Sequence, residues 1–496
     1  MNAALTFVFG LCLAGCVPAV AAIGLSPATF FLAPFIGAAS AAVAVELEVG
    51  IGGTMVPWFV VVAVVVNVLS FGILLRRRSF PTWEGGGWSL LLFAGVLGAL
   101  AVPLIGLRTH EVGYDPAVIW TTHTLLISSG HQTLVSGLQN PVYAYSSPSY
   151  PPLVPAVGAL GYAFAGRSVL VLGPELTALL NAAAVGLIAT GIAKVSRPAT
   201  RRGHAVTIAL SALICLVCFG VGGDFGVNGY TDVLWSAAAV GAVVWGLVLP
   251  RSRSNLQVAW SCAIVASLTK DEGLLAAVAV LLLIALRFRS PLLRAGSGDA
   301  AARRELVSSW ATWVCMVVGP ALPGLIWAIQ IRTLGIKSYF FGTPQSESLS
   351  LRASATVAAM SHYLAVVPAA LLVILIGCAW FRGTRRTMQL GHPGWLWAAW
   401  AGGVGCIFAT YVFGSPEIHW WLSTSVDRTT IFARMLLLTD IAIWTLVALN
   451  GLKPGLFEER VGGGTGPPEA AVTPGPAAAT VGRQDRGADE RAWTVS

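Results

Sequence analysis

The sequence predicts an all-α, polytopic integral membrane protein with about thirteen transmembrane helices, and three observations support this fold class. Hydrophobic residues make up 56% of the chain and charged residues only 10%. The mean hydropathy is +0.76, and a soluble domain of 496 residues could not bury so much apolar surface. Lys and Arg form short clusters between long apolar runs. That pattern is typical of membrane topology, so the net charge of +8 does not indicate nucleic-acid binding.

The apolar runs define the expected helices, because a helix that crosses a bilayer needs about 20 apolar residues. Runs near that length lie at 4–23, 27–46, 55–75, 87–106, 168–193, 205–222, 233–249, 308–330, 356–380, 394–413 and 433–450. A further stretch, 257–288, holds two shorter runs that LTKDEGL separates. We therefore expect a helical hairpin there, with its tip at the outer surface.

The basic clusters predict the orientation of these helices, since Lys and Arg concentrate in cytoplasmic loops. The clusters fall at 76–78, 197–202, 251–253, 287–304 and 382–386. All of them lie on one side only if 150–166 does not cross the membrane. This segment is short and proline-rich, so we expect a half-buried helix on the outer side. The N-terminus is then outside the plasma membrane, and the C-terminus is cytoplasmic.

The composition changes after residue 455. The segment GGGTGPPEAAVTPGPAAAT is rich in Gly, Pro and Ala and has no apolar period, so it cannot bury enough surface to become ordered. We expect a transmembrane domain over 1–455, with a large outer loop at 107–167, and a disordered cytoplasmic tail over 456–496.

Polar stretches collect on the outer side in this topology. They are the 107–150 loop, DFGVNGYTD with Asp224 and Asp232, LTKDEGL with Lys270, Asp271 and Glu272, the 331–355 loop, and SPEIHWWLSTSVDR with His419, Asp427 and Arg428. The inner side offers mostly Arg clusters in short loops. Any chemistry is therefore expected on the extracytoplasmic face.

Two of these stretches place a cation beside carboxylates, near the apolar slab where charge is costly. Lys270 beside Asp271 and Glu272 fits either a solvated, self-neutralising turn or a cation aimed at an anionic ligand. Arg428 beside Asp427 fits either a side chain that snorkels to the interface or a second such cation.

Asp115 in GYDPAVIW has two interpretations as well. It stands directly before Pro116, and AVIWTTHTLLISSG then predicts a short helix along the outer interface. An Asp before a Pro at the first helical position is a good helix cap. A carboxylate in a half-dry cleft can equally take a proton from a substrate. Glu111, four residues earlier, is a second acid in the same loop.

Five motifs in order resemble a known family. They are GYDPAVIW at 113–120, PSYPPLVP at 148–155, GYTDVLW at 229–235, LTKDEGL at 268–274 and WWLSTSVDR at 420–428. Together they resemble the GT-C class of polytopic membrane glycosyltransferases, and most closely bacterial members with a YD…W first loop and a K(N/D)EG turn. The resemblance covers roughly 87–450. The three N-terminal spans before it are not part of a minimal GT-C core.

The resemblance implies an activity and roles for four residues. GT-C enzymes transfer a sugar from a polyprenyl-phosphate donor to an acceptor outside the cytoplasm. The catalytic base of the family falls on Asp115, with Glu111 as a possible second carboxylate. Lys270 and Arg428 match positions that could hold the donor phosphate. Many family members have two adjacent acids in this loop, whereas here three residues separate Glu111 from Asp115. Either of these two residues could therefore be the catalytic base.

Several other residues are candidates for a substrate cleft. Trp120 and Tyr150 could line it with flat aromatic faces or simply anchor the interface. Asp232, Glu272 and His419 also belong to the outer polar stretches. His419 could either line the substrate cleft or belong to the aromatic belt at the membrane interface. No cofactor is expected and no metal site is evident, although Glu111, Asp115 and Asp232 together could hold a divalent ion.

The expected chemistry is a single inverting displacement, in which an acid deprotonates the acceptor and cations stabilise the leaving phosphate. The partners are then a polyprenyl-phosphate sugar, a glycan or glycolipid acceptor of the cell envelope, and the lipid bilayer. Two alternatives remain: a transporter or lipid flippase, and a polymerase or ligase that uses a diphospho-lipid oligosaccharide. A flippase would place charges deep in several spans, and the sequence has few of them, with Glu175 and Asp440 as the main exceptions.

Overall fold

The fold is described from a computed structural model of the chain. It describes residues 2–76, 82–84, 86–105, 112–196, 198, 200–289, 300–336, 347–365 and 392–450. The chain divides into two compact units, Met1–Phe457 and Glu458–Ser496. This boundary is close to the one that the composition predicts. The second unit lies outside the described residues, so the expectation of a disordered tail is not tested.

The prediction of an all-α polytopic membrane protein is confirmed. The structure is 86% helical, and no strand occurs in the part of the chain that it describes. Eight of the described helices are long and apolar enough to cross a membrane. The predicted number of spans is larger, partly because α11 (Arg253–Thr269) has 17 residues and because α12 (Asp271–Arg289) carries charges at both ends. The exact number stays a prediction.

The N-terminal helices are α1 (Asn2–Ile23), α2 (Pro27–Ile51), α3 (Met55–Arg76) and α4 (Gly86–Ile105). Two glycines let α1 and α2 touch backbone to backbone. A Cβ on Gly15 would lie 2.0 Å from the Ala33 carbonyl oxygen, and one on Gly37 would lie 2.4 Å from that of Leu11. α3, in contrast, exposes apolar side chains along its length, as expected of a surface that faces lipid.

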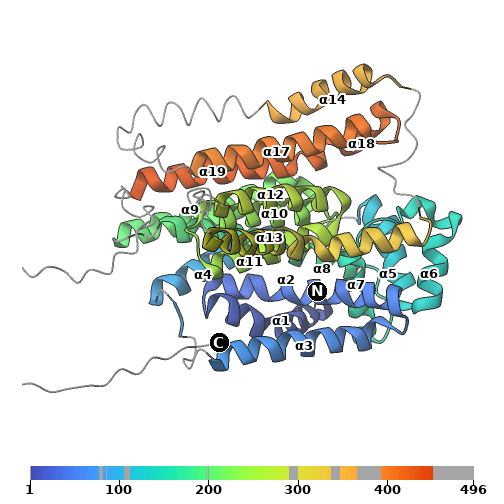
Figure 1. Ribbon diagram of the computed structural model, residues 1–496, viewed down its shortest axis with the longest axis horizontal. Helices are drawn as coiled ribbons and strands as arrows, with labels where there is room; N and C mark the ends of the chain where they lie inside the picture. The colour runs from blue at the N-terminus through green and yellow to red at the C-terminus, as the bar shows by residue number, and fades with distance from the viewer. Residues whose placement is uncertain are drawn as a thin grey trace, which may run out of the picture. The chain divides into compact units, whose positions relative to one another are not determined.

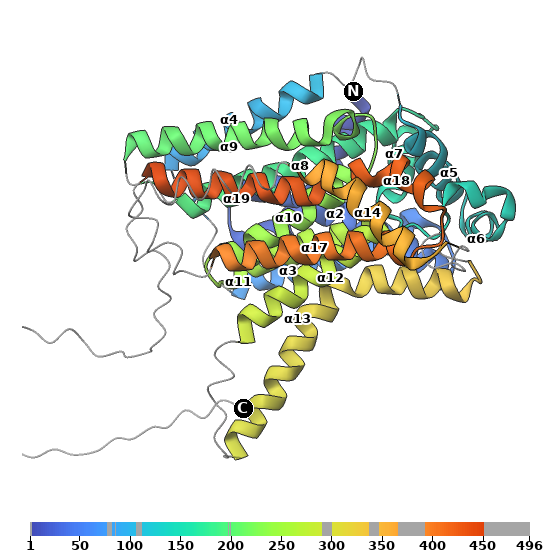
Figure 2. The ribbon, with the colours of Figure 1, turned by 90° about the horizontal axis from the view of Figure 1, so that it is seen from above.

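The core lies around α10 (Asp232–Val243), which η5 (Val244–Val248) extends as a π-helical segment. Every residue of both segments is buried. Their neighbours are α8 (Leu172–Ser196), α11, α12 and α19 (Ile431–Asn450), and Figures 1 and 2 show α10 among them. Asp232, the first residue of α10, therefore stands at one end of the most buried helix.

The C-terminal half adds α13 (Ala300–Thr333), α14 (Leu349–Leu364), α17 (His392–Phe413) and α18 (Ile418–Thr429). Arg352 fastens α14 to the connection between α17 and α18. Its guanidinium donates to the carbonyl oxygens of Tyr411, Val412 and Pro416 and pairs with Glu347 at 2.6 Å. Arg352 is thus a structural residue, which holds the start of α18 in place.

Short helices gather at one end of the bundle, which Figure 1 shows at its right. They are η2 (Pro116–Trp120), α5 (Thr121–Ser128), α6 (His131–Gln139), η3 (Pro141–Ser146) and α7 (Leu153–Ala165). α7 has 13 residues, too few to cross a bilayer, as expected for 150–166. It is more deeply buried than predicted, because α2, α5 and α8 pack around it.

Candidate active site

A chain of ion pairs joins four distant segments at the end of the bundle that holds the short helices. Arg428 Nη1 lies 2.5 Å from an Asp115 carboxylate oxygen and 3.8 Å from Asp232 Oδ2. The other Asp232 oxygen accepts a hydrogen bond from Lys270 Nζ at 2.9 Å. Lys270 also lies 3.6 Å from Glu272. Three carboxylates and two cations therefore form one connected network.

Asp115 begins the network, and its surroundings rule out a role as a helix cap. Its backbone is already helical, with φ −57° and ψ −45°, and its side chain makes no capping hydrogen bond. Pro116 follows at the first position of a π-helical turn. The carboxylate pairs instead with Arg428, which is 313 residues away in the sequence. The cap interpretation is therefore wrong, and the acid stands opposite a cation.

Arg428 comes from the last turn of α18 and points into the bundle. Its side chain donates two hydrogen bonds to the Thr424 carbonyl oxygen, at 3.2 and 2.9 Å. The guanidinium carbon lies 4.8 Å from the centre of the Tyr230 ring and 5.9 Å from that of Phe225. Arg428 is only 9% exposed, so the expectation that it snorkels to the interface is wrong.

Lys270 is the single residue between α11 and α12, so the predicted hairpin is present. Its backbone is extended and its side chain is 3% exposed, which excludes a solvated turn. Burial by itself lowers the pKa of Lys270, but the carboxylates of Asp232 and Glu272 raise it well above its usual value. The neighbouring carboxylates therefore favour the charged form of Lys270, and the Tyr150 ring centre lies 5.6 Å from its Nζ.

Gly273 explains the glycine of LTKDEGL. A Cβ at this position would lie 2.1 Å from the Ala266 carbonyl oxygen of α11. That atom belongs to the backbone and cannot rotate away, so only glycine lets the first turn of α12 approach α11 this closely. The close approach fixes the turn that carries Lys270.

We expect Gly273→Ala to lower the free energy of unfolding by about 1–3 kcal/mol, because the added methyl group must push α11 and α12 apart. Thermal unfolding of the purified protein in detergent measures this loss. Gly220→Ala in α9 (Arg201–Gly222) is the matched control, since a Cβ there meets nothing within 4 Å. Equal melting temperatures for the two variants would contradict the assigned role of Gly273.

Trp120 and Tyr150 form a wall beside the network instead of an open cleft. The two rings stack with their centres 5.5 Å apart, and they are 4% and 7% exposed. Burial is the main factor that raises the pKa of the Tyr150 hydroxyl well above its usual value, so the phenol stays neutral. Both aromatic residues limit the access of water to Lys270.

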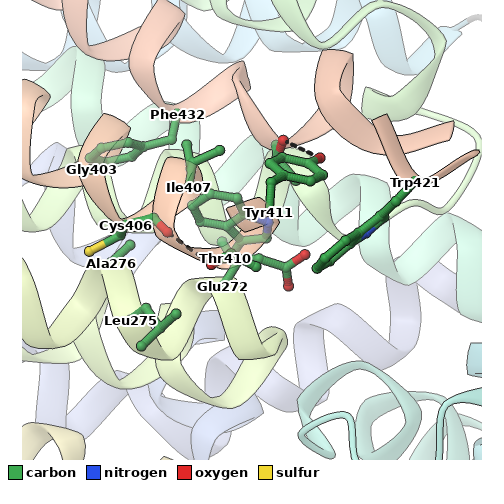
Figure 3. A pocket seen from close by; sticks show the side chains of 12 residues that line it. Glu272, Leu275, Ala276, Gly403, Cys406, Ile407, Thr410, Tyr411, Trp421 and Phe432 are labelled. Atoms are coloured by element: carbon green, nitrogen blue, oxygen red, sulfur yellow. Dashed lines mark hydrogen bonds between the residues drawn. The ribbon is translucent and has the colours of Figure 1, made fainter. Parts of the chain in front are cut away.

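Glu272 connects the network to a mostly apolar cavity between α12, α17, α18 and α19. Figure 3 shows its carboxylate between Tyr411 and Trp421. Tyr411 is held by hydrogen bonds to Ser425 at 2.7 Å and Thr429 at 3.0 Å. The remaining lining is apolar and includes Leu275, Ala276, Ile407 and Phe432. The cavity has a volume of about 10 Å³, room for no more than about one water molecule, so Glu272 lies in a close-packed region.

Other predicted site residues are not brought together. His419 lies in the first turn of α18 with its side chain exposed, and no contact joins it to the described network. Glu111 lies outside the described residues. The described residues contain no group of three or more side chains placed to hold a metal ion. The oxygens of Asp115 and Asp232 face Arg428, which leaves the interpretation as a metal site without structural support.

Tyr230 and Phe225 were not predicted, although they flank Arg428. Their rings lie 5.0 Å apart, at an angle of 76°. The signal was present in GYTDVLW, where Tyr230 stands two residues before Asp232. Gly113 makes room for the Tyr230 ring, because a Cβ on Gly113 would lie 2.2 Å from it.

Comparisons of the chain with protein-family models, with curated proteins and with solved structures found no match.

Proposed function

We propose that this protein is a membrane glycosyltransferase that moves a sugar from a polyprenyl-phosphate donor to a glycan or glycolipid acceptor of the cell envelope. The observation that carries the proposal is the convergence of Asp115, Lys270 and Arg428. An acid and two cations from separate segments form one buried network beside an apolar cavity. The order of motifs that resembles GT-C enzymes supports the same reaction.

In the proposed reaction the acceptor hydroxyl oxygen attacks the anomeric carbon of the donor sugar. The hydroxyl proton passes to the Asp115 carboxylate, and the bond between the anomeric carbon and the phosphate oxygen breaks with inversion. The electron pair leaves with the polyprenyl phosphate, whose new negative charge Lys270 and Arg428 stabilise. The products are the glycosylated acceptor, polyprenyl phosphate and a proton on Asp115.

In the proposed enzyme without bound donor, Asp115 and Arg428 form an ion pair. While Arg428 holds the Asp115 carboxylate, its bonded oxygen is not free to contact an acceptor hydroxyl. A donor phosphate competes for Arg428, because guanidinium groups bind phosphate oxygens in two-point contacts. The proposed order is therefore that the donor binds first, Arg428 turns to its phosphate, and Asp115 is released to deprotonate the acceptor.

We place the site on the extracytoplasmic face of the plasma membrane, with a cytoplasmic C-terminus. Exposed basic residues at the opposite helix ends support this orientation, among them Arg201 and Arg202 at the start of α9 and Arg253 at the start of α11.

One observation favours the alternative of a transporter or flippase. Asp440 lies in the middle of α19 and is only 3% exposed, so the chain does hold one carboxylate deep in a span. Glu175, in contrast, lies in the first turn of α8 and is half-buried, at the end of the bundle that carries the network.

The test is transfer by the purified protein in proteoliposomes, with a panel of polyprenyl-phosphate hexoses and pentoses and a crude envelope glycan as acceptor. We expect one donor to release polyprenyl phosphate only when the acceptor is present. We also expect Arg428→Lys to raise the KM for that donor about tenfold, because an ammonium lacks the two-point contact. Movement of the intact donor between leaflets without acceptor, and no transfer, would instead establish a flippase.

A further inference from the structure

A second cavity lies at the opposite end of the bundle from the ion-pair network. Its volume is about 410 Å³, the size of a small-molecule site. The cavity is lined by the last residues of α1 and α8, by the first residues of α2, α4 and α9, and by Trp245 of η5. Trp245 stands about 20 Å along the helix axis from Asp232, so this cavity is separate from the candidate active site.

Two basic side chains in this cavity are held on aromatic faces. Lys194 Nζ lies 5.3 Å from the centre of the Trp245 ring. The His204 ring stacks on Trp88, with centres 4.8 Å apart and planes at 3°. Lys194 comes from the last turn of α8 and His204 from the first turn of α9, so the chain reversal between these helices places both in one cavity. The first contact holds Lys194 beside the Trp245 ring, and the second holds the His204 ring on Trp88.

The backbone adds to the positive character of the cavity. Ser26 and Pro27 at the start of α2, Trp88 and Ser89 in the first turn of α4 and His204 of α9 all line it, so three helix N-termini converge there. Each helix N-terminus carries a partial positive charge and directs N–H groups outward. Among the described residues that line the cavity, Glu84 alone carries a carboxylate.

The remaining lining is apolar and comes from Ile23, Ala28, Leu92, Ala193 and Ile208. A cavity with donors and cations on one part of its wall and apolar side chains on the other fits a molecule with an anionic head and a hydrocarbon part. The exposed arginines Arg201 and Arg202 at this end would also attract anionic lipid.

We infer that this cavity binds the phosphate-bearing headgroup of an anionic phospholipid from the leaflet at the Arg-rich end of the bundle. Lys194 and His204 contact the phosphate, the N-termini of α2, α4 and α9 face its oxygens, and the apolar part of the wall contacts the start of the acyl chains. The inference does not depend on the proposed transfer reaction, because no residue of the ion-pair network takes part.

The experiment uses the full chain in neutral detergent, with dioleoyl phosphatidylglycerol, dioleoyl phosphatidylcholine or inorganic phosphate added. Binding is measured by native mass spectrometry and by the shift in melting temperature. We expect retained phosphatidylglycerol and a rise in melting temperature, no such effect from phosphatidylcholine, and a much weaker effect from millimolar phosphate. Equal stabilisation by phosphate alone would assign the cavity to a soluble anion and overturn the lipid assignment.

Three variants test the residues. Lys194→Ala with His204→Ala should weaken phosphatidylglycerol binding by at least about fivefold, because it removes the Lys194 charge, whereas Arg253→Ala, an exposed cation at the same end, should change it little. Glu84→Gln removes a negative charge from the wall and should leave binding equal or tighter. Weaker binding by Glu84→Gln, or unchanged binding by the double variant, would overturn the proposal. If the double variant folds poorly, Lys194→Met alone is compared by mass spectrometry on its folded fraction.

Discussion

Replacing Asp115 with Asn is expected to lower the rate of sugar transfer by about 10²–10⁴-fold, because the amide cannot take the acceptor proton. The amide oxygen still accepts a hydrogen bond from Arg428, so the protein should insert and fold as before. The measurement is kcat for release of polyprenyl phosphate, together with the melting temperature of the same sample.

Asp224→Asn is the matched control for this variant. Asp224 lies in η4 (Gly223–Gly226), at the same end of the bundle, and its side chain is exposed. Its loss of charge should change the rate by no more than about twofold. Full activity of Asp115→Asn would transfer the role of base to another acid and would remove the main support for the proposed mechanism.

Replacing Lys270 with Met is expected to lower the free energy of unfolding by about 3–5 kcal/mol. The change leaves Asp232, which is 1% exposed, with only the more distant Arg428 as a partner at 3.8 Å. A buried carboxylate that loses its nearest cation is strongly destabilising. Unfolding in mixed micelles by a denaturing detergent measures the loss.

The double variant Lys270→Met with Asp232→Asn tests the physical cause. It removes both charges, so it should recover a large part of the stability while transfer stays abolished. Arg332→Met, at the exposed end of α13, should change stability by at most about 0.5 kcal/mol. If the double variant were less stable than Lys270→Met alone, the stabilising pair would not be the one that the structure shows.

Hydropathy was sufficient to predict the all-α membrane class and the α11–α12 hairpin, because both depend on local composition. The apolar runs need no knowledge of their partners, and LTKDEGL interrupts its run so sharply that a turn follows. The same locality explains the two alternatives that the structure excludes, Asp115 as a helix cap and Arg428 as a snorkelling side chain. A helix cap and a snorkelling side chain both depend only on residues nearby in the sequence. The sequence does not show which distant residues a charged side chain contacts.

The sequence could not predict which charged residues of distant segments form ion pairs. Asp232 was placed only in a general cleft, whereas it bridges Lys270 and Arg428. His419 and Arg428 belong to the same motif, but the helical period places their side chains on different faces of α18. The His419 side chain is exposed, whereas that of Arg428 is buried. Tyr230 was missed because an aromatic residue next to a membrane helix is usually an interfacial anchor.

The contact between Asp232 and Lys270 also bears on how the chain enters the bilayer during synthesis. Each charged group near the hydrocarbon region resists insertion by roughly 2.5–3.5 kcal/mol when it is alone. The two residues are only 38 positions apart, so their attraction becomes available as soon as three consecutive helices have emerged from the ribosome. We therefore expect α10, α11 and α12 to leave the translocon together, well before Arg428 of α18 has been translated.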